Sequence, residues 1–272
     1  MVKPRISVII GIYNCASTLS EALDSLYAQT YQGFKIILCD DGSTDNTYQV
    51  ASDYAKTHDN IILLRNEKNM GLNFTLNQCL KYADTEYVAR MDGDDISLPE
   101  RFEKEISFLD KHPEFAIVST PMIYFDENGE FSRGTAKIKV PQIGIFNYGS
   151  PFSHAPCMVR NEAYIAVGGY TINQRLIRME DYNLWMKMYA KGYRGYNLDE
   201  CLYAMRDDRN ASRRRNLRAR LNGIYAHYLA LKELKLSKKL FCKYAIINLA
   251  KGLMPNIMYQ YFHSKKLRDA KN

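Results

Sequence analysis

The sequence predicts an α/β layered fold, because short apolar segments alternate with segments of helical periodicity throughout the first 120 residues. Strands buried on both faces form continuous apolar runs rich in β-branched residues, whereas the helices that cover them carry one apolar stripe. Both kinds of segment recur at the spacing of a parallel sheet. A chain of 272 residues is near the upper limit for one hydrophobic core, so we expect a main domain with an appendage.

The elements of the first half follow in regular order. Residues 5–12 (RISVIIGI) form the first expected strand, and residues 17–29 form a helix that Ser17 or Thr18 could cap. The same two patterns then predict strands at 35–39, 61–64 and 87–91 and helices at 45–55, 72–82 and 100–110.

The alternation loosens after Pro99, and residues 131–149 form an irregular stretch. Gly168 and Gly169 are placed to end a helix, and the chain after residue 210 is helical, with breaks near 236–237 and at Pro255. The other elements expected here are strands at 115–119, 122–125, 193–198 and 201–206 and helices at 161–167 and 180–190.

Charge divides the chain into two parts. Residues 1–205 hold 20 Lys and Arg against 26 Asp and Glu, whereas residues 206–272 hold 17 against 4. An acidic body with a basic tail is typical of a protein whose tail meets an anionic surface. We therefore expect a main domain at 1–206 and a basic, amphipathic helical extension at 207–272.

Composition excludes several classes of protein. Apolar residues at 46% and charged residues at 25% are incompatible with wholesale disorder, and no uncharged apolar run reaches the ~18 residues of a membrane span. The opening segment MVKPRISVII does not have the pattern of a secretory signal. Six scattered cysteines without a C-x-x-C pair argue against a zinc site and a disulfide framework. We expect reduced thiols in a cytoplasmic protein.

Acidic residues follow two of the predicted strands. Ligands of an open parallel sheet bind beyond the carboxyl ends of its strands, so Asp41 is expected to contact a base or ribose, whereas Asp45 is expected to cap the next helix. Asp92 and Asp94 lie two apart after the fourth strand and can converge on one point. Such a pair repels unless a cation intervenes, and oxygen ligands favour Mg²⁺ or Mn²⁺ bridging to phosphates, with Asp95 as a third carboxylate.

A further acidic pair, Glu180 and Asp181, opens a predicted helix. The helix dipole stabilises ionised carboxylates there, and a plain preference for negative charge at a helix start is the alternative interpretation. Trp185, the only tryptophan, lies one turn further along. It is either a core residue or the floor of an acceptor site.

Together these motifs resemble the family 2 glycosyltransferases, which have the GT-A fold, a Rossmann-like mixed sheet flanked by helices. The resemblance covers about residues 3–214. Four spaced motifs in the right order are more specific than any one of them. Within the family, the stretch from RMEDYNLW to GYRGYNLDECLY is most similar to bacterial exopolysaccharide and biofilm-matrix enzymes of the EpsE type. In chain order the matching residues are Tyr13 and Asn14, DDGSTDNT, Asn69 with Gly71, MDGDD with Pro99 and Arg101, His154, Gly168-Gly169-Tyr170 and Glu180-Asp181.

The resemblance implies an inverting, metal-dependent transfer of a sugar from a nucleotide-diphosphate sugar, usually a UDP-sugar. The acceptor would be a hydroxyl of a saccharide or a lipid-linked saccharide in exopolysaccharide or capsule synthesis. The main domain would then have a nucleotide-binding half at about 1–120 and an acceptor half at about 121–206. The signature Q-x-x-R-W of processive synthases is absent, so we expect one sugar per encounter.

The resemblance also implies roles for single residues. Asp181 matches the catalytic base, and Asp92 and Asp94 match the D-x-D that holds the metal and diphosphate, supported by Asp95. Tyr13 and Asp41 would contact the uracil and ribose, although Gly11 replaces a small polar residue that often makes one base contact. The candidates for phosphate or acceptor contacts are Arg90, Arg206, His154, Glu180 and Trp185, and a satisfied core histidine is the alternative for His154.

The basic tail has two interpretations. Residues 238–255 mix lysines with apolar residues and suit the plane of an anionic membrane, where a polyprenyl-diphosphate-linked acceptor would lie on the inner face. The alternative is a helical cap packed on the catalytic domain.

Other functions are less compatible with the sequence. A dinucleotide-binding turn and a P-loop are both absent after the first strand, and a nucleic-acid binder would leave the acidic strand ends without a purpose. The remaining rival is a glycosyltransferase-like scaffold that acts as a binding or regulatory protein.

Overall fold

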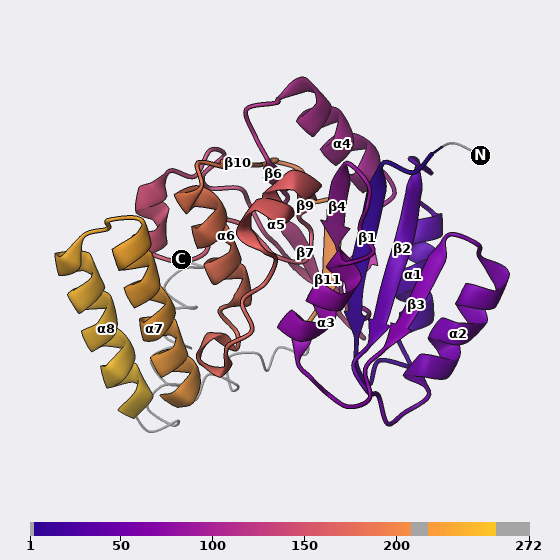
Figure 1. Ribbon diagram of the computed structural model, residues 1–272, viewed down its shortest axis with the longest axis horizontal. Coiled ribbons are helices and arrows are strands. Elements are labelled where there is room, and N and C mark those ends of the chain that lie inside the picture. The colour runs from indigo at the N-terminus through magenta and orange to yellow at the C-terminus, as the bar shows by residue number, and fades with distance from the viewer. Residues whose placement is uncertain (1–2, 208–216, 254–272) are drawn as a thin grey trace.

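The computed structural model describes residues 3–207 and 217–253 (Figure 1). Its main sheet has seven strands in the order β10-β6-β9-β4-β1-β2-β3. Six of them are parallel, and β9 runs antiparallel to its neighbours β4 and β6, so the sheet is mixed. The strands are β1 (Ile6–Ile12), β2 (Phe34–Asp40), β3 (Ile61–Arg65), β4 (Tyr87–Arg90), β6 (Ile117–Ser119), β9 (Met158–Arg160) and β10 (Gly195–Asn197).

Helices cover both faces of this sheet (Figure 1). One core cluster joins the sheet to α1 (Leu19–Tyr27), α2 (Thr47–Thr57) and α4 (Arg101–Lys111). The other joins the opposite face to α3 (Leu72–Leu80), α5 (Asn161–Val167) and α6 (Glu180–Ala190). These elements confirm the α/β layered fold and the predicted alternation. All six cysteines are free thiols, as expected.

A smaller sheet, in the order β5-β11-β7-β8, was only partly predicted. Its strands are β5 (Ile96–Ser97), β11 (Tyr203–Arg206), β7 (Met122–Asp126) and β8 (Gly129–Arg133). The expectation of irregular structure at 131–149 was wrong in part, because β8 and the short 3₁₀ helix η1 (Ile143–Asn147) lie there. Every residue of β8 is exposed, so this edge strand has no apolar face that the sequence could reveal.

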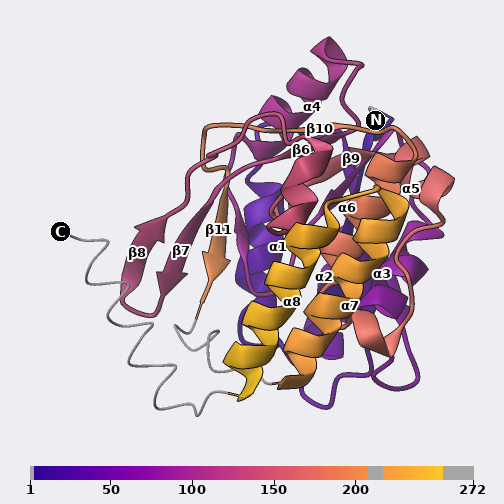
Figure 2. The same cartoon turned by 90° about the vertical axis from the view of Figure 1, so that its left-hand side faces the viewer.

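The basic tail contains α7 (Leu217–Glu233) and α8 (Lys238–Leu253), which lie side by side on the α6 side of the molecule (Figures 1 and 2). Ala226 and Ala230 of α7 belong to the core that contains α6, whereas α8 packs on α7. The cap interpretation therefore describes α7. Residues 208–216 and 254–272 of the predicted extension lie outside the described residues, and the boundary at 206 stays a prediction.

Candidate functional site

The predicted site residues follow the carboxyl ends of parallel strands. Strands β1, β2 and β4 end at Ile12, Asp40 and Arg90, and they pair in register next to one another. The residues that follow them therefore meet at one edge of the sheet. Tyr13 follows β1 directly and is 46% exposed, so its ring is available to a ligand at this edge.

Asp41 holds the loop that follows β3. Its buried carboxylate accepts hydrogen bonds from Asn66 Nδ2 at 2.8 Å and from the backbone N–H groups of Met70 and Gly71 at 2.8 and 2.9 Å. Sequence reasoning did not anticipate these three partners. The expected contact of Asp41 with a base or ribose stays a prediction, and any such contact would add to this structural role.

Arg90 is the buried cation of the site. Its Nη2 donates to Asp92 Oδ1, and its backbone carbonyl accepts from Arg101 Nη2 at 2.9 Å. From the sequence, strand periodicity was expected to bring Asp92 and Asp94 together. Strand β4 ends at Arg90, before both residues, so this expectation was wrong. The two residues lie in a turn instead, in which the backbone N–H of Asp95 donates to the carbonyl of Asp92 at 3.5 Å.

Asp94 and Asp95 have different environments within this turn. Asp94 is exposed, yet partial enclosure of its carboxyl and then the charge of Asp92 raise its pKa. Asp95 is buried, and its carboxylate accepts from Tyr203 Oη at 2.9 Å and from the backbone N–H of Arg206 at 2.8 Å. Burial, followed by the charges of Asp92 and Asp94, raises the pKa of Asp95 to about 8.

Two residues of β11 complete the turn. Tyr203 Oη also accepts from the backbone N–H of Asp92 at 3.1 Å, and Arg206 Nε donates to the carbonyl of Asp94 at 3.0 Å. Arg206 was among the predicted residues, and the structure places it against the D-x-D turn. Tyr203 was missed, because a tyrosine in an apolar strand gives no signal of its partners.

The predicted base lies at the start of α6. Burial raises the pKa of both Glu180 and Asp181, which opposes the helix-dipole effect that the sequence argument invoked. A hydrogen bond with the Ser150 side chain and the positive charge of Arg90 lower the pKa of Asp181 in part. The same Arg90 charge lowers the pKa of Asp94 in part. The buried guanidinium of Arg90 therefore pairs with one predicted centre, and its charge acts on both.

His154 and Trp185 are neighbours in the interior, and the charge of Arg90 acts on His154. His154 Nε2 is 2.8 Å from Tyr170 Oη, and burial followed by the charge of Arg90 holds the pKa of His154 well below its usual range. Trp185 is fully buried and packs edge-on against Phe152 and His154. The ring of Trp185 has no free face for a sugar, so the core interpretation holds and the acceptor-floor interpretation does not.

The donor set fits a metal ion only in part. No cluster of three or more His, Cys, Asp or Glu side chains is arranged for a metal in the parts of the chain that the structure describes. Asp94, however, is exposed, and its carboxylate accepts no hydrogen bond from another described residue. Two carboxylates at an open edge suit an ion that takes its other ligands from water and phosphate, as Mg²⁺ and Mn²⁺ do.

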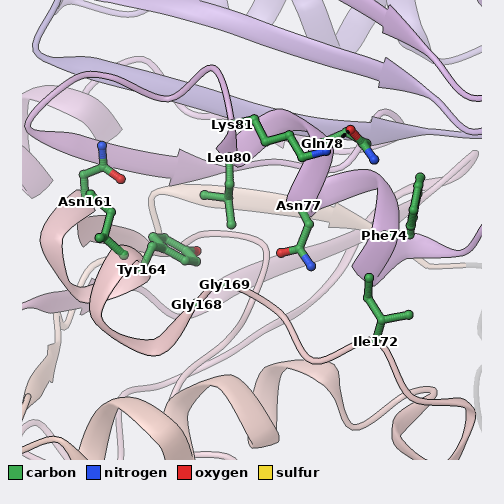
Figure 3. Close-up of a pocket in the computed structure, with 11 residues that line it drawn as sticks. Phe74, Asn77, Gln78, Leu80, Lys81, Asn161, Tyr164, Gly168, Gly169 and Ile172 are labelled. Carbon is green, nitrogen blue, oxygen red and sulfur yellow. Dashed lines mark hydrogen bonds between the residues drawn. The ribbon is translucent and has the colours of Figure 1, made fainter.

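Two pockets differ in their relation to the predicted site residues. A pocket of about 390 Å³ near the carboxyl ends of β6 and β10 is lined by Ser150, the partner of Asp181, together with Thr120 and Asn197. Another, of about 430 Å³, lies between α3 and the turn after α5 (Figure 3). There Asn77 exchanges two 2.8 Å hydrogen bonds with the backbone of Tyr170. None of the predicted site residues lines this second pocket.

Comparisons with known proteins give a family model and relatives of nearly full length. The family model described as glycosyl transferase family 2 matches residues 7–177. The chain is 41% identical to the Bacillus subtilis protein EpsE, which is named a glycosyltransferase, over 98% of this chain and 96% of that one. It is 33% identical to the Escherichia coli UDP-Gal:alpha-D-GlcNAc-diphosphoundecaprenol beta-1,3-galactosyltransferase, over 97% of each.

Two solved structures share the fold. TarS of S. aureus, residues 1–349 in complex with UDP-GlcNAc, has a TM-score of 0.69 at 22% identity and covers 92% of this chain and 71% of that one. The mannosyltransferase PcManGT of Pyrobaculum calidifontis, in complex with GDP-Man and Mn²⁺, has a TM-score of 0.66 at 19% identity and covers 93% and 74%. The predicted GT-A architecture is thereby confirmed.

Proposed function

This chain belongs to glycosyl transferase family 2, and from that premise we propose that it is an inverting, metal-dependent and non-processive enzyme of bacterial polysaccharide synthesis. It transfers one sugar from a nucleotide-diphosphate sugar, most simply a UDP-sugar, to a hydroxyl of a saccharide carried on a lipid diphosphate. The donor class follows the UDP-GlcNAc of TarS and the UDP-Gal of the Escherichia coli relative. The acceptor class follows the diphosphoundecaprenol in the name of that relative.

The observation that carries the proposal is a buried cation whose charge acts on both acidic centres. Arg90 pairs with Asp92, and its charge also acts on Asp94 and Asp181. An inverting transfer needs a leaving-group site and a base on opposite sides of one sugar. In this proposal, residues far apart in the sequence supply both, and the charge of Arg90 acts on each.

Asp92 and Asp94 would hold the divalent ion, with Arg206 beside them. When bound, Mg²⁺ or Mn²⁺ neutralises negative charge on a diphosphate. The positive charges of Arg90, paired with Asp92, and of Arg206, paired with Glu21, would stabilise the same negative charge as it develops on the departing group. Tyr13 and Asp41 lie at the ends of β1 and β2, where a nucleoside would extend from that diphosphate.

Asp181 would be the general base. The acceptor oxygen forms its bond to the anomeric carbon as the bond from that carbon to the diphosphate oxygen breaks, and the hydroxyl proton passes to the carboxylate of Asp181. The raised pKa of Asp181 makes its ionised form a stronger base than an exposed carboxylate. The pocket that Ser150 lines offers the acceptor an approach to this residue.

The helices of the tail would bring the enzyme to the anionic inner face of the cell membrane, where the lipid-linked acceptor lies. Within the described ranges, no helix is both long and apolar enough for a membrane crossing. Association would therefore be peripheral. It is supported by four lysines and no acidic residue in α8, together with exposed Ile246 and Leu249.

Purified protein incubated with UDP-Gal, UDP-GlcNAc and GDP-Man, with and without Mn²⁺, tests the proposal. We expect one donor to release its nucleoside diphosphate only when the ion is present. With a soluble diphosphate-linked acceptor, NMR of the product should show an anomeric configuration opposite to that of the donor. A product that retains the configuration would exclude the inverting mechanism. Tight donor binding without turnover would favour the regulatory scaffold.

A further inference from the structure

The start of α6 is held from outside the catalytic domain. Residues 173–179 lead from the turn after α5 into α6 and include the 3₁₀ helix η2 (Gln174–Leu176). Arg178 in this segment has a left-handed backbone, with φ 64°. A non-glycine residue rarely adopts that conformation, which persists only where its surroundings enforce it. Glu180 and Asp181 follow directly, so whatever fixes this segment also fixes the predicted base.

Helix α7 contacts the segment before the base at two points. Asn222 Nδ2 donates to the backbone carbonyl of Ile177 at 3.2 Å, and Asn222 itself is buried. The guanidinium of Arg175 lies 3.8 Å from the centre of the Tyr225 ring, within the range of a cation–π interaction. Both contacts come from one side of α7, within a single turn of that helix.

The hairpin of α7 and α8 also holds the residue immediately after the base. The ring of His227 stacks on Tyr182 at 4.5 Å, and Tyr244 of α8 stacks on the other face of His227 at 3.6 Å. Tyr182 Oη donates to the carbonyl of Phe146 at 2.6 Å, which anchors the far end of its ring. The chain is therefore fixed on both sides of Asp181, four residues before it and one residue after it.

We propose that Asn222, Tyr225 and His227 of α7 are positioning residues, which hold residues 175–182 so that the carboxylate of Asp181 faces the donor site. The inference rests on the proposed function, because it assigns a purpose to the base. On this view the basic extension is a part of the catalytic apparatus as well as a cap. A displacement of about 1 Å at a reacting group can cost about 100-fold in rate, so small contacts at this distance are sufficient.

The test compares Asn222→Ala with Asn248→Ala. Asn248 is an asparagine of the same hairpin. Its Nδ2 donates to the carbonyl of Tyr244 at 3.0 Å, its Oδ1 accepts from Arg220 Nη1 at 3.5 Å, and neither partner belongs to residues 173–179. We expect Asn222→Ala to lower kcat about tenfold while the KM for the donor stays within about twofold. Asn248→Ala should leave kcat unchanged. Tyr225→Leu should reproduce the loss of kcat, whereas Tyr225→Phe, which keeps the aromatic ring, should retain wild-type kcat. This second pair of variants tests the proposal if Asn222→Ala does not fold.

A double-mutant cycle separates this inference from the function it rests on. If Asn222 acts through the base, Asn222→Ala causes no further loss of turnover when Asp181 is already asparagine. An equal loss in both backgrounds, or an unchanged kcat in both Asn222→Ala and Tyr225→Leu, would overturn the positioning role. Full activity of Asp181→Asn alone would instead refute the assignment of Asp181 as the base, the part of the proposed function on which this inference rests.

Discussion

The guanidinium of Arg90 bonds the carboxylate of Asp92 from a buried position at the end of β4, so the D-x-D turn and the interior of the protein are joined by one ion pair. A buried charge needs such a partner, since removing one member of a buried pair strands the other. Arg90 is also held through its carbonyl by Arg101, which is fully buried. The position of the D-x-D turn is thus set by contacts with buried residues at the end of β4.

Asp94→Asn should weaken the response to Mn²⁺ without unfolding the protein. The carboxylate of Asp94 is exposed, and its loss removes one of the two charges proposed to hold the ion. We expect the Mn²⁺ concentration for half-maximal turnover to rise at least about tenfold, and chelation by EDTA to abolish turnover in the wild type. Asp84→Asn is the control, because Asp84 is exposed and precedes β4, at the end of this strand opposite to Asp94. Its response to Mn²⁺ should equal that of the wild type. An unchanged metal response would remove Asp94 from the ion site.

Asp181→Asn should lose transfer while it retains the donor. The amide keeps the size of the carboxylate but cannot accept the proton of the acceptor, and loss of a general base costs at least about 100-fold. Calorimetry should give a dissociation constant for UDP close to that of the wild type. Near-normal turnover of this variant would show that another group takes the proton.

The location of the candidate site at one edge of the sheet could be predicted from the sequence more readily than the contacts of its residues. Asp92 and Asp94 follow an apolar strand, so their place required only the alternation of strands and helices. Tyr203 and Ser150 were missed, because their contacts with Asp92 and Asp181 join segments far apart in the chain. Trp185 had two equal interpretations, and only its complete burial decided between them.

Gly169→Ala should destabilise the protein more than Gly168→Ala. Both glycines have left-handed φ angles, 65° and 67°, but a Cβ at Gly169 would lie 2.5 Å from Asn77 Oδ1, whereas the space around Gly168 is open. We expect a loss of about 1 kcal/mol in the free energy of unfolding for Gly168→Ala and about 3 kcal/mol for Gly169→Ala. Urea unfolding monitored by circular dichroism measures both. Equal losses would mean that Asn77 can move aside at little cost.

Acid should destabilise the protein through His227. Burial lowers the pKa of His227 from its usual 6.5 to about 4, so folding favours the neutral ring. This stability is fully present above about pH 6.5 and is lost as the pH falls towards 4, by up to roughly 3 kcal/mol. The rings packed on it, Tyr182 and Tyr244, carry no charge in acid. His227→Phe keeps the stack and should flatten the fall in melting temperature between pH 7 and pH 5. His112→Phe, at a half-exposed histidine that pairs with Glu114, should not flatten the fall.

The outer side of α8 should determine binding to anionic membranes. Tyr244 packs on α7 through the His227 stack, yet Ile246 and Leu249 remain 67% and 41% exposed, so this helix is apolar on both sides. Self-association through this side would bring its lysines together, whereas an anionic bilayer is complementary to them.

We expect full-length protein to float with vesicles that contain phosphatidylglycerol at low salt and to be released as salt is added. Ile246→Asp should lower the partition coefficient at least about tenfold, because inserting one isoleucine contributes ~2 kcal/mol. Ile165→Asp, at an exposed isoleucine of α5, is the matched control and should bind like the wild type. Wild-type protein that ignores such vesicles at low salt, or equal binding by Ile246→Asp, would show that α8 does not dock on lipid.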